Sequence, residues 1–124
     1  MSDLKFTKTY EWVKVEGEVA TVGITDFAQL ELGDIVFVEL PTVGEKVNQF
    51  ARLGTIESTK TASEFFSPLT GEVIEVNNGV VKNPQWINED PYGKGWLVKL
   101  KVDNQAEIDN LLDEQSYKSL VEEK

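Results

Sequence analysis

Apolar and polar residues alternate along most of this chain, a pattern typical of strands that bury one face. From Val98 to Val102, apolar side chains occupy every second position, and Lys99 and Lys101 lie between them. We predict strands, by residue number, at 4–8, 12–15, 19–24, 34–40, 52–58, 65–66, 73–76 and 96–102. Residues 77–88 are expected to form a loop or one short helical turn. The pattern indicates a mainly β protein.

Helical signals are few and short. Asp26 is predicted to cap a short helix that ends at Gly33. Asn104 is predicted to cap a second helix, with Glu107 at the capping-box position, and Ser116 is predicted to cap a third. The helices therefore decorate the β structure rather than form its core.

Length and composition are those of one globular unit. The chain has 124 residues, of which 40% are hydrophobic, enough for one buried core but short of a second. We therefore predict a single domain spanning residues 1–124, with a C-terminal helical segment at about 104–124.

The charge balance disfavours two classes of partner. With 12 basic and 22 acidic residues, the formal net charge is −10, a field that repels phosphate backbones and anionic lipid head groups. The sequence lacks both an apolar run of about 18 residues and a signal-peptide pattern. We expect no nucleic-acid or membrane partner and a cytoplasmic protein, or one of the mitochondrial matrix if a transit peptide has been removed.

Two absent residue types restrict the chemistry further. The chain has no cysteine and therefore neither a thiolate nucleophile nor a disulfide, and it has no histidine, the usual general base near neutral pH. Thiol proteases and serine–histidine triads are excluded, and no metal site is expected. Any redox or group-transfer chemistry must use the reactive atoms of a bound cofactor.

One lysine, Lys60, lies between two predicted strands. The strand at 52–58 precedes it, and Phe65 and Phe66 resume the β pattern after it, so Lys60 is expected near a chain reversal. The reversal lacks the Asn-Gly or Asp-Gly pair that tight hairpins prefer. Pro68 ends the second strand. On these residues alone, an ordinary solvated lysine remains an alternative.

A resemblance to a known family extends this interpretation. The segments Glu57–Ser63 and Ser67–Val73 resemble the lipoyl-attachment region of the glycine cleavage system H-protein family. Four other segments resemble the same family in the same order: Tyr10–Val13, Val19–Asp26, Leu32–Pro41 and Asn88–Leu97. The resemblance implies a lipoyl-domain-like fold, a flattened sandwich or barrel of two small antiparallel sheets with a short helix and C-terminal helices.

The resemblance also assigns chemistry to Lys60. It implies that lipoate is attached covalently to the ε-amino group of Lys60, and that Glu57 and Gly71 matter to lipoylation. Gly71 has an equally good structural interpretation as a turn residue. Biotin is disfavoured, because biotinylated lysines usually lie between methionines, whereas Thr59 and Thr61 flank Lys60 here.

Four further residues align with family positions that line a groove. In that family, the lipoyl arm rests there while it carries an aminomethyl group. The four residues are Thr9, Glu11, Glu31 and Glu64. Their carboxylates would hold a cationic amine by charge-assisted hydrogen bonds, although a plain acidic surface is the competing interpretation. We rank Glu11 first and Glu31 last. Tyr10 departs from the family, which usually has histidine there.

The function implied is that of a carrier rather than an enzyme, with no catalytic residues of its own. Its lipoyl arm would take the aminomethyl group of glycine from the glycine decarboxylase P protein to the aminomethyltransferase T protein. Dihydrolipoamide dehydrogenase, the L protein, would reoxidise its dithiol, and a lipoate ligase or lipoyl transferase would load Lys60. Two alternatives stay open: a relay that passes lipoate to other acceptors, and an interaction module with unmodified Lys60.

Overall fold

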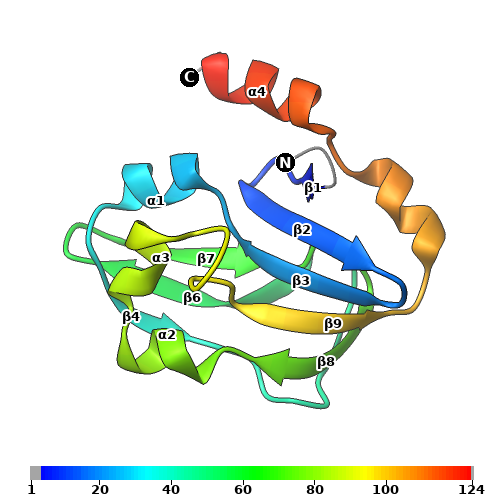
Figure 1. The fold of residues 1–124 in the computed structure, drawn as a ribbon, viewed down its shortest axis with the longest axis horizontal. Helices are drawn as coiled ribbons and strands as arrows, with labels where there is room; N and C mark the ends of the chain where they lie inside the picture. The colour runs from blue at the N-terminus through cyan, green and yellow to red at the C-terminus, as the bar shows by residue number, and fades with distance from the viewer. Residues whose placement is uncertain (1–3, 124) are drawn as a thin grey trace.

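The computed structural model describes residues 4–123, which form nine strands in two antiparallel sheets (Figure 1). The predicted limits of the domain at residues 1 and 124 lie outside the described residues. The strands are β1 (Leu4–Phe6), β2 (Glu11–Glu16), β3 (Val19–Ile24), β4 (Ile35–Glu39), β5 (Lys46–Val47), β6 (Arg52–Ser58), β7 (Ala62–Phe66), β8 (Gly71–Val76) and β9 (Val98–Val102). The predicted mainly β class is confirmed.

The two sheets pack as an open sandwich, and neither of them closes into a barrel over the described range. One sheet has the strand order β1-β2-β3-β9-β8-β5, and the other has the order β4-β6-β7. The core between them is built from the buried apolar positions of the alternating strands, for example Val22 in β3, Ile56 in β6 and Leu100 in β9. Alternation therefore positions the side chains that bind the sheets together.

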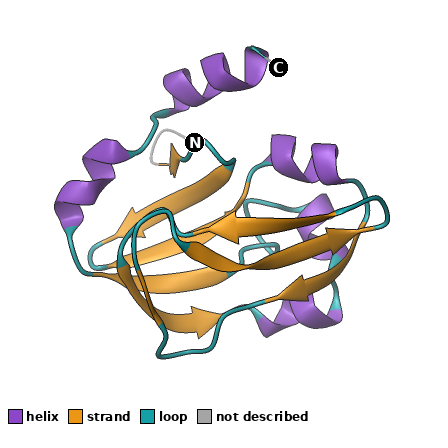
Figure 2. Cartoon of the chain, turned by 180° about the vertical axis from the view of Figure 1, so that it is seen from behind, coloured by secondary structure: helices purple, strands orange, loops and turns teal. Residues whose placement is uncertain are grey.

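Helices lie around the margins of the sandwich, as the view from behind shows (Figure 2). They are α1 (Asp26–Leu32), α2 (Asn78–Lys82), α3 (Gln85–Glu89), the 3₁₀-helix η1 (Gln105–Asn110) and α4 (Glu114–Glu122). Residues 77–88, expected as a loop or one helical turn, instead contain α2 and most of α3. No helix among the described residues is both long and apolar enough to cross a bilayer.

The cap of α1 differs from the prediction. Thr25, not Asp26, is the N-cap, because its backbone is extended and its Oγ1 accepts a hydrogen bond from the Ala28 N–H at 3.3 Å. Asp26 is the first helical residue and accepts a hydrogen bond from the Gln29 side chain at 2.9 Å. The helix ends at Gly33, as predicted.

The C-terminal caps also differ. Asn104 caps a 3₁₀-helix rather than an α-helix, and Glu107 does not complete a capping box. The Glu107 carboxylate instead accepts hydrogen bonds from the backbone N–H and the hydroxyl of Thr70, at 2.8 and 2.7 Å. Helix α4 begins earlier than expected, since Asp113 is its cap and accepts a hydrogen bond from the Ser116 N–H.

A second apolar cluster, whose buried members are Leu4, Phe6, Trp12 and Tyr117, packs α4 against the sandwich. The ring of Tyr117 stacks on Phe6 in β1, with 4.4 Å between the ring centroids. Its hydroxyl donates a hydrogen bond to Thr25 Oγ1 at 2.6 Å, and burial raises the pKa of Tyr117 to about 12. Tyr117 therefore connects the C-terminal helix to the residue that caps α1.

Candidate functional site

Lys60 is exposed at the tip of the β6–β7 hairpin, where the sequence places a reversal. The Ser58 N–H donates to the Thr61 carbonyl at 2.7 Å, and Ser58 Oγ accepts from the N–H groups of Lys60 and Thr61, each at 3.1 Å. Neither Thr59 nor Lys60 has a positive φ. The turn therefore does not need an Asn-Gly pair, because the Ser58 side chain satisfies its backbone donors.

Gly33 lies directly beneath the side chain of Lys60. A Cβ atom added to Gly33 would be 3.1 Å from Lys60 Cε, and the φ of Gly33, +87°, favours glycine. The Thr59 N–H also donates to the Asp34 carbonyl at 3.0 Å, which joins the hairpin to the end of α1. Gly33 thus ends α1, as predicted, and its lack of a side chain also leaves room for the side chain of Lys60.

A groove of about 190 Å³ lies between α1, β7 and the turn that joins β1 to β2. Its lining consists of Thr9, Tyr10, Glu11, Ile24, Phe27, Ala28, Glu31, Leu32, Ile56, Ser63, Glu64 and Phe65. The structure thus brings together all four residues that the family resemblance assigned to a groove. Leu32 in this lining is the chain neighbour of Gly33, over which the Lys60 side chain lies, so the lining comes close to Lys60.

Glu11 is buried in the wall of this groove, with 1% of its surface exposed. Its Oε1 accepts hydrogen bonds from the hydroxyls of Thr7 and Thr9, and its Oε2 accepts one from the Phe66 N–H at 2.9 Å. Burial raises the pKa of Glu11, and these hydrogen bonds oppose that rise. The interpretation of Glu11 as a plain surface acid is therefore excluded.

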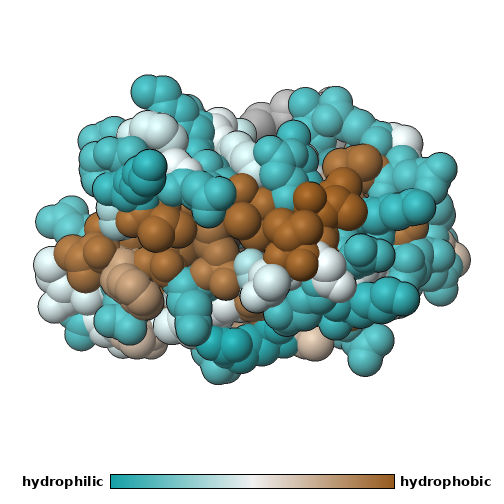
Figure 3. Space-filling model, turned by 90° about the horizontal axis from the view of Figure 1, so that it is seen from below, coloured by the Kyte–Doolittle hydropathy of each residue, from teal (hydrophilic) through white to brown (hydrophobic). Residues whose placement is uncertain are grey.

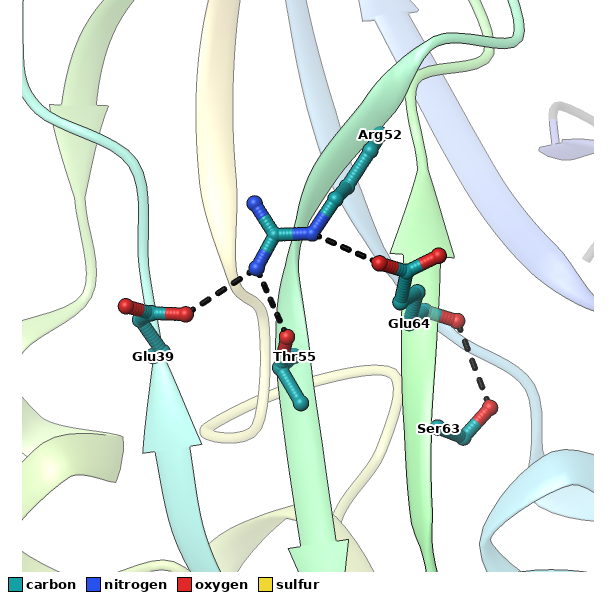
Figure 4. A network of polar contacts seen from close by, with 5 residues as sticks. All are labelled: Glu39, Arg52, Thr55, Ser63 and Glu64. Carbon is teal, nitrogen blue, oxygen red and sulfur yellow. Dashed lines mark hydrogen bonds and ion pairs between the residues drawn. The ribbon is translucent and has the colours of Figure 1, made fainter.

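The other two groove carboxylates are exposed. Glu64 forms an ion pair with Arg52, whose Nε lies 2.9 Å from Glu64 Oε2. Arg52 also donates to Glu39 and Thr55, so its guanidinium links the three strands of the smaller sheet (Figure 4). A carboxylate held by Arg52 is less available to a second cation, whereas Glu31 on α1 carries no such ion pair in the structure as described.

The structure separates the two residues expected to matter for lipoylation. Glu57 is exposed on β6, where it pairs with Phe37 on one side and Ala62 on the other. Gly71 is buried at the start of β8, beyond the end of β7 that is far from Lys60, and the five residues of β7 alone span roughly 16 Å as an extended strand. Glu57 therefore lies beside Lys60, and Gly71 does not.

Tyr10 forms an aromatic part of the groove wall that the sequence did not predict. Its φ is 72°, in the left-handed region that few tyrosines adopt. Its ring packs against Phe27 of α1, with 5.0 Å between centroids, and its backbone carbonyl accepts a hydrogen bond from the Thr25 N–H. The departure from the usual histidine thus places a ring, without an imidazole base, at the groove.

Known proteins are similar to this chain in sequence and in architecture. A family model described as glycine cleavage H-protein matches residues 4–124. The chain belongs to the glycine cleavage H-protein family. The H protein of Carboxydothermus hydrogenoformans is 50% identical over 121 residues, which cover 98% of this chain and 93% of that protein. The H protein of Bacteroides fragilis is 52% identical over 119 residues, covering 96% and 94%.

A solved H-protein structure has the same fold. The crystal structure of a glycine cleavage system H protein from Mycobacterium marinum superposes with a TM-score of 0.86 at 37% identity. The match covers 96% of both chains. The family resemblance expected from the ordered motifs is therefore confirmed over nearly the whole chain.

Glu11 gives this H-protein family member a testable pH dependence. Because burial raises its pKa above the ordinary 4.5, the folded state binds a proton more readily than the unfolded state. The free energy of unfolding should then fall as pH rises from about 4.5 through the raised pKa. Glu11→Gln should lack this fall, because an amide does not titrate. The local structure should persist, since the amide can accept from the Phe66 N–H and donate to rotated threonine hydroxyls.

Urea unfolding of both proteins between pH 4 and 8 measures this contribution. The stability of Glu11→Gln relative to the parent should increase with pH and then level off. Glu57→Gln, at an exposed position, serves as the control and should show no such trend. A stability difference for Glu11→Gln that stays constant with pH would contradict the prediction.

Proposed function

We propose that this chain is the lipoyl-bearing shuttle of a glycine cleavage system, with lipoate in amide linkage to Lys60. The observation that carries the proposal is the exposed Lys60 at a hairpin tip beside a groove that contains a buried carboxylate. Family membership supports it. The chain would carry the aminomethyl group of glycine from the P protein to the T protein and its dithiol to the L protein, without catalysing a step itself.

The residues of the groove are compatible with a lipoyl group. Phe27, Leu32, Ile56 and Phe65 offer apolar contacts for a hydrocarbon chain and a ring, and Glu11 offers carboxylate oxygens. When bound, the lipoyl group supplies a dithiol that carries an aminomethyl group and a pair of electrons. No chemistry of this kind is available from the chain's own side chains.

The chain's own residues present and shelter the arm. Ser58 holds the turn that exposes Lys60, and Gly33 leaves the space through which the side chain passes toward the groove. Glu11, held in place by three donors, is itself buried in the wall of the groove. A carboxylate fixed in this way stabilises a cationic amine more than a mobile surface acid does. We rank Glu31 and the Arg52-bound Glu64 as weaker contributors.

Glu57 and Gly71 contribute to lipoylation in different ways under this proposal. Glu57 lies three residues before Lys60 on an exposed strand, where a lipoate ligase or lipoyl transferase would contact it. Gly71 acts indirectly, because it permits the close approach of β8 to β9. The net charge of −10 favours brief, salt-sensitive encounters with the successive partners over one permanent complex.

Reconstitution tests the proposal. Incubation with a lipoate ligase, lipoate and ATP should add one lipoyl group, and peptide mapping should locate it on Lys60. The loaded chain should then support glycine-dependent reduction of NAD⁺ when the P, T and L proteins are present together with tetrahydrofolate, which accepts the one-carbon unit at the T protein. Lipoyl found mainly on Lys82 or Lys94, or no modification at all, would overturn the assignment and favour an unmodified interaction module.

Substitution of Glu11 tests the sheltering groove. Glu11→Gln removes the negative charge, and losing a charge-assisted hydrogen bond of about 1–2 kcal/mol should increase loss of the carried amine to water by roughly five- to thirtyfold. Timed release of ammonia, without T protein, measures this loss. Glu45→Gln, outside the groove, is the control and should match the parent. Equal release from all three proteins would remove Glu11 from the site.

A further inference from the structure

Two consecutive apolar residues of β4 are exposed close to Lys60. Val36 is 55% exposed and Phe37 is 49% exposed, although strand residues normally alternate between buried and exposed. The pairing of β4 with β6 contains a bulge between Ile35 and Phe37. A bulge redirects side chains along a strand and is typical of functional positions at sheet edges, and β4 is an edge strand.

These residues contribute to a larger apolar feature of the surface. Seen from below, on the side where β4, α2 and β8 lie in Figure 1, apolar side chains form a band across the molecule (Figure 3). The exposed large apolar residues of these elements and of the loop after β4 are Val36, Phe37, Val43, Ile74 and Val81. An exposed apolar area is typical of a surface that contacts partners, and within it Val36 and Phe37 are the members on β4, the strand that pairs with the hairpin strand β6.

The β4 end of this feature is joined to the Lys60 hairpin by specific pairings. Phe37 pairs with Glu57, three residues before Lys60, and the Asp34 carbonyl accepts a hydrogen bond from the Thr59 N–H at 3.0 Å. The side chains of Asp34 and Glu57 are both exposed. An apolar pair with acidic neighbours therefore lies next to the hairpin that carries Lys60.

We propose that Val36, Phe37 and Glu57 form the docking surface for the enzyme that acylates Lys60. The acylating enzyme is the partner that must come closest to the hairpin. An enzyme that acts at the far end of a lipoyl arm can keep its surface away from the hairpin, whereas an acylating enzyme must bring its reacting centre to Lys60 Nζ itself. Charge complementarity predicts an apolar centre with basic residues around it on that enzyme. The inference rests on the proposed lipoylation of Lys60.

The reaction at this surface is an acyl transfer. The unprotonated Lys60 nitrogen attacks the carbonyl carbon of an activated eight-carbon acid, an acyl adenylate. A carbon–nitrogen amide bond forms, the carbon–oxygen bond to the phosphate breaks, AMP leaves with the electron pair, and the nitrogen releases one proton. Val36, Phe37 and Glu57 take no part in these bonds, so their contribution is to binding and should change KM rather than kcat.

The chain offers closely matched controls for a test. Val43 has the same 55% exposure as Val36, and Phe50, at 50%, matches Phe37, yet neither control residue is paired with the hairpin strand β6. With a purified lipoate ligase, lipoate and ATP, Val36→Ser/Phe37→Ser should lose about tenfold or more in kcat/KM for acylation of Lys60, mainly through KM. Val43→Ser/Phe50→Ser should stay within about twofold of the parent.

Two further measurements keep the inference falsifiable. Phe37→Thr retains β propensity and should show the KM effect even if the double serine variant unfolds. A chain with Lys60→Arg should inhibit acylation of the parent competitively, and adding Val36→Ser/Phe37→Ser should weaken that inhibition. Unchanged KM in Phe37→Thr, or unchanged inhibition, would overturn the docking surface. Failure of the parent itself to be acylated at Lys60 would instead overturn the proposed function.

Discussion

Lys60→Arg is expected to abolish lipoylation of this chain while leaving its fold intact. Arginine keeps the positive charge and a long side chain, but its guanidinium stays protonated and does not serve as an acyl acceptor. Lys60 is exposed at a turn, so the free energy of unfolding should change by no more than about 0.5 kcal/mol. Intact mass after ligase treatment and thermal unfolding measure the two effects.

Lys82→Arg is the matched control, because Lys82 is also exposed, at the end of α2. This variant should gain one lipoyl group as the parent does. Lys60→Arg should also fail to support glycine-dependent NAD⁺ reduction with the P, T and L proteins. A lipoyl group on Lys60→Arg would contradict the assignment of Lys60 as the attachment site. A large drop in the melting temperature of this variant would contradict the expectation that Lys60 contributes little to the fold.

Gly71→Ala should cause the largest loss of stability among these substitutions. A Cβ atom at residue 71 would lie 2.3 Å from the Lys101 backbone carbonyl oxygen, and a backbone atom in a paired strand cannot move aside cheaply. Overpacking of this kind destabilises by about 2–3 kcal/mol, or roughly 10 °C in melting temperature for a chain of this length. Calorimetry measures the change.

Gly17→Ala is the control that measures the cost of replacing a glycine by alanine where no steric clash results. A Cβ atom at Gly17 meets nothing within 4 Å, and only its positive φ opposes alanine, which costs about 1 kcal/mol. Gly71→Ala should therefore be the less stable of the two. Well below its melting temperature, Gly71→Ala should still accept lipoate at the rate of the parent. A folded Gly71→Ala chain that cannot be lipoylated would contradict the view that Gly71 acts only through stability.

The strand pattern and the position of Lys60 could be predicted from the sequence because both depend on local properties. Period-two alternation requires only that one face of each strand be buried, and the residues between β6 and β7 had to reverse the chain. The ordered motifs also identified the family. The lipoyl assignment of Lys60 came from that resemblance and stays a prediction.

Helix starts were less predictable because several neighbouring side chains can cap the same helix. Thr25 and Asp26 are both good caps, and the backbone angles, which the surrounding fold determines, selected Thr25. Asn104 caps η1 as predicted, but Glu107, expected at the capping-box position, instead binds Thr70, 37 residues earlier in the chain. Local propensity does not reveal a competing partner that is distant in sequence.

The sequence by itself thus determined the β class, the family and the turn that exposes Lys60. Only the tertiary structure decided the chemical character of the residues around it. The family resemblance ranked Glu11 first among the groove acids, but only packing of the sandwich buries it and gives it Phe66 as a donor. Gly33 is an ordinary helix end until the hairpin lies over it. Burial and neighbours far apart along the chain arise only when the strands pair, which is why no local pattern contains them.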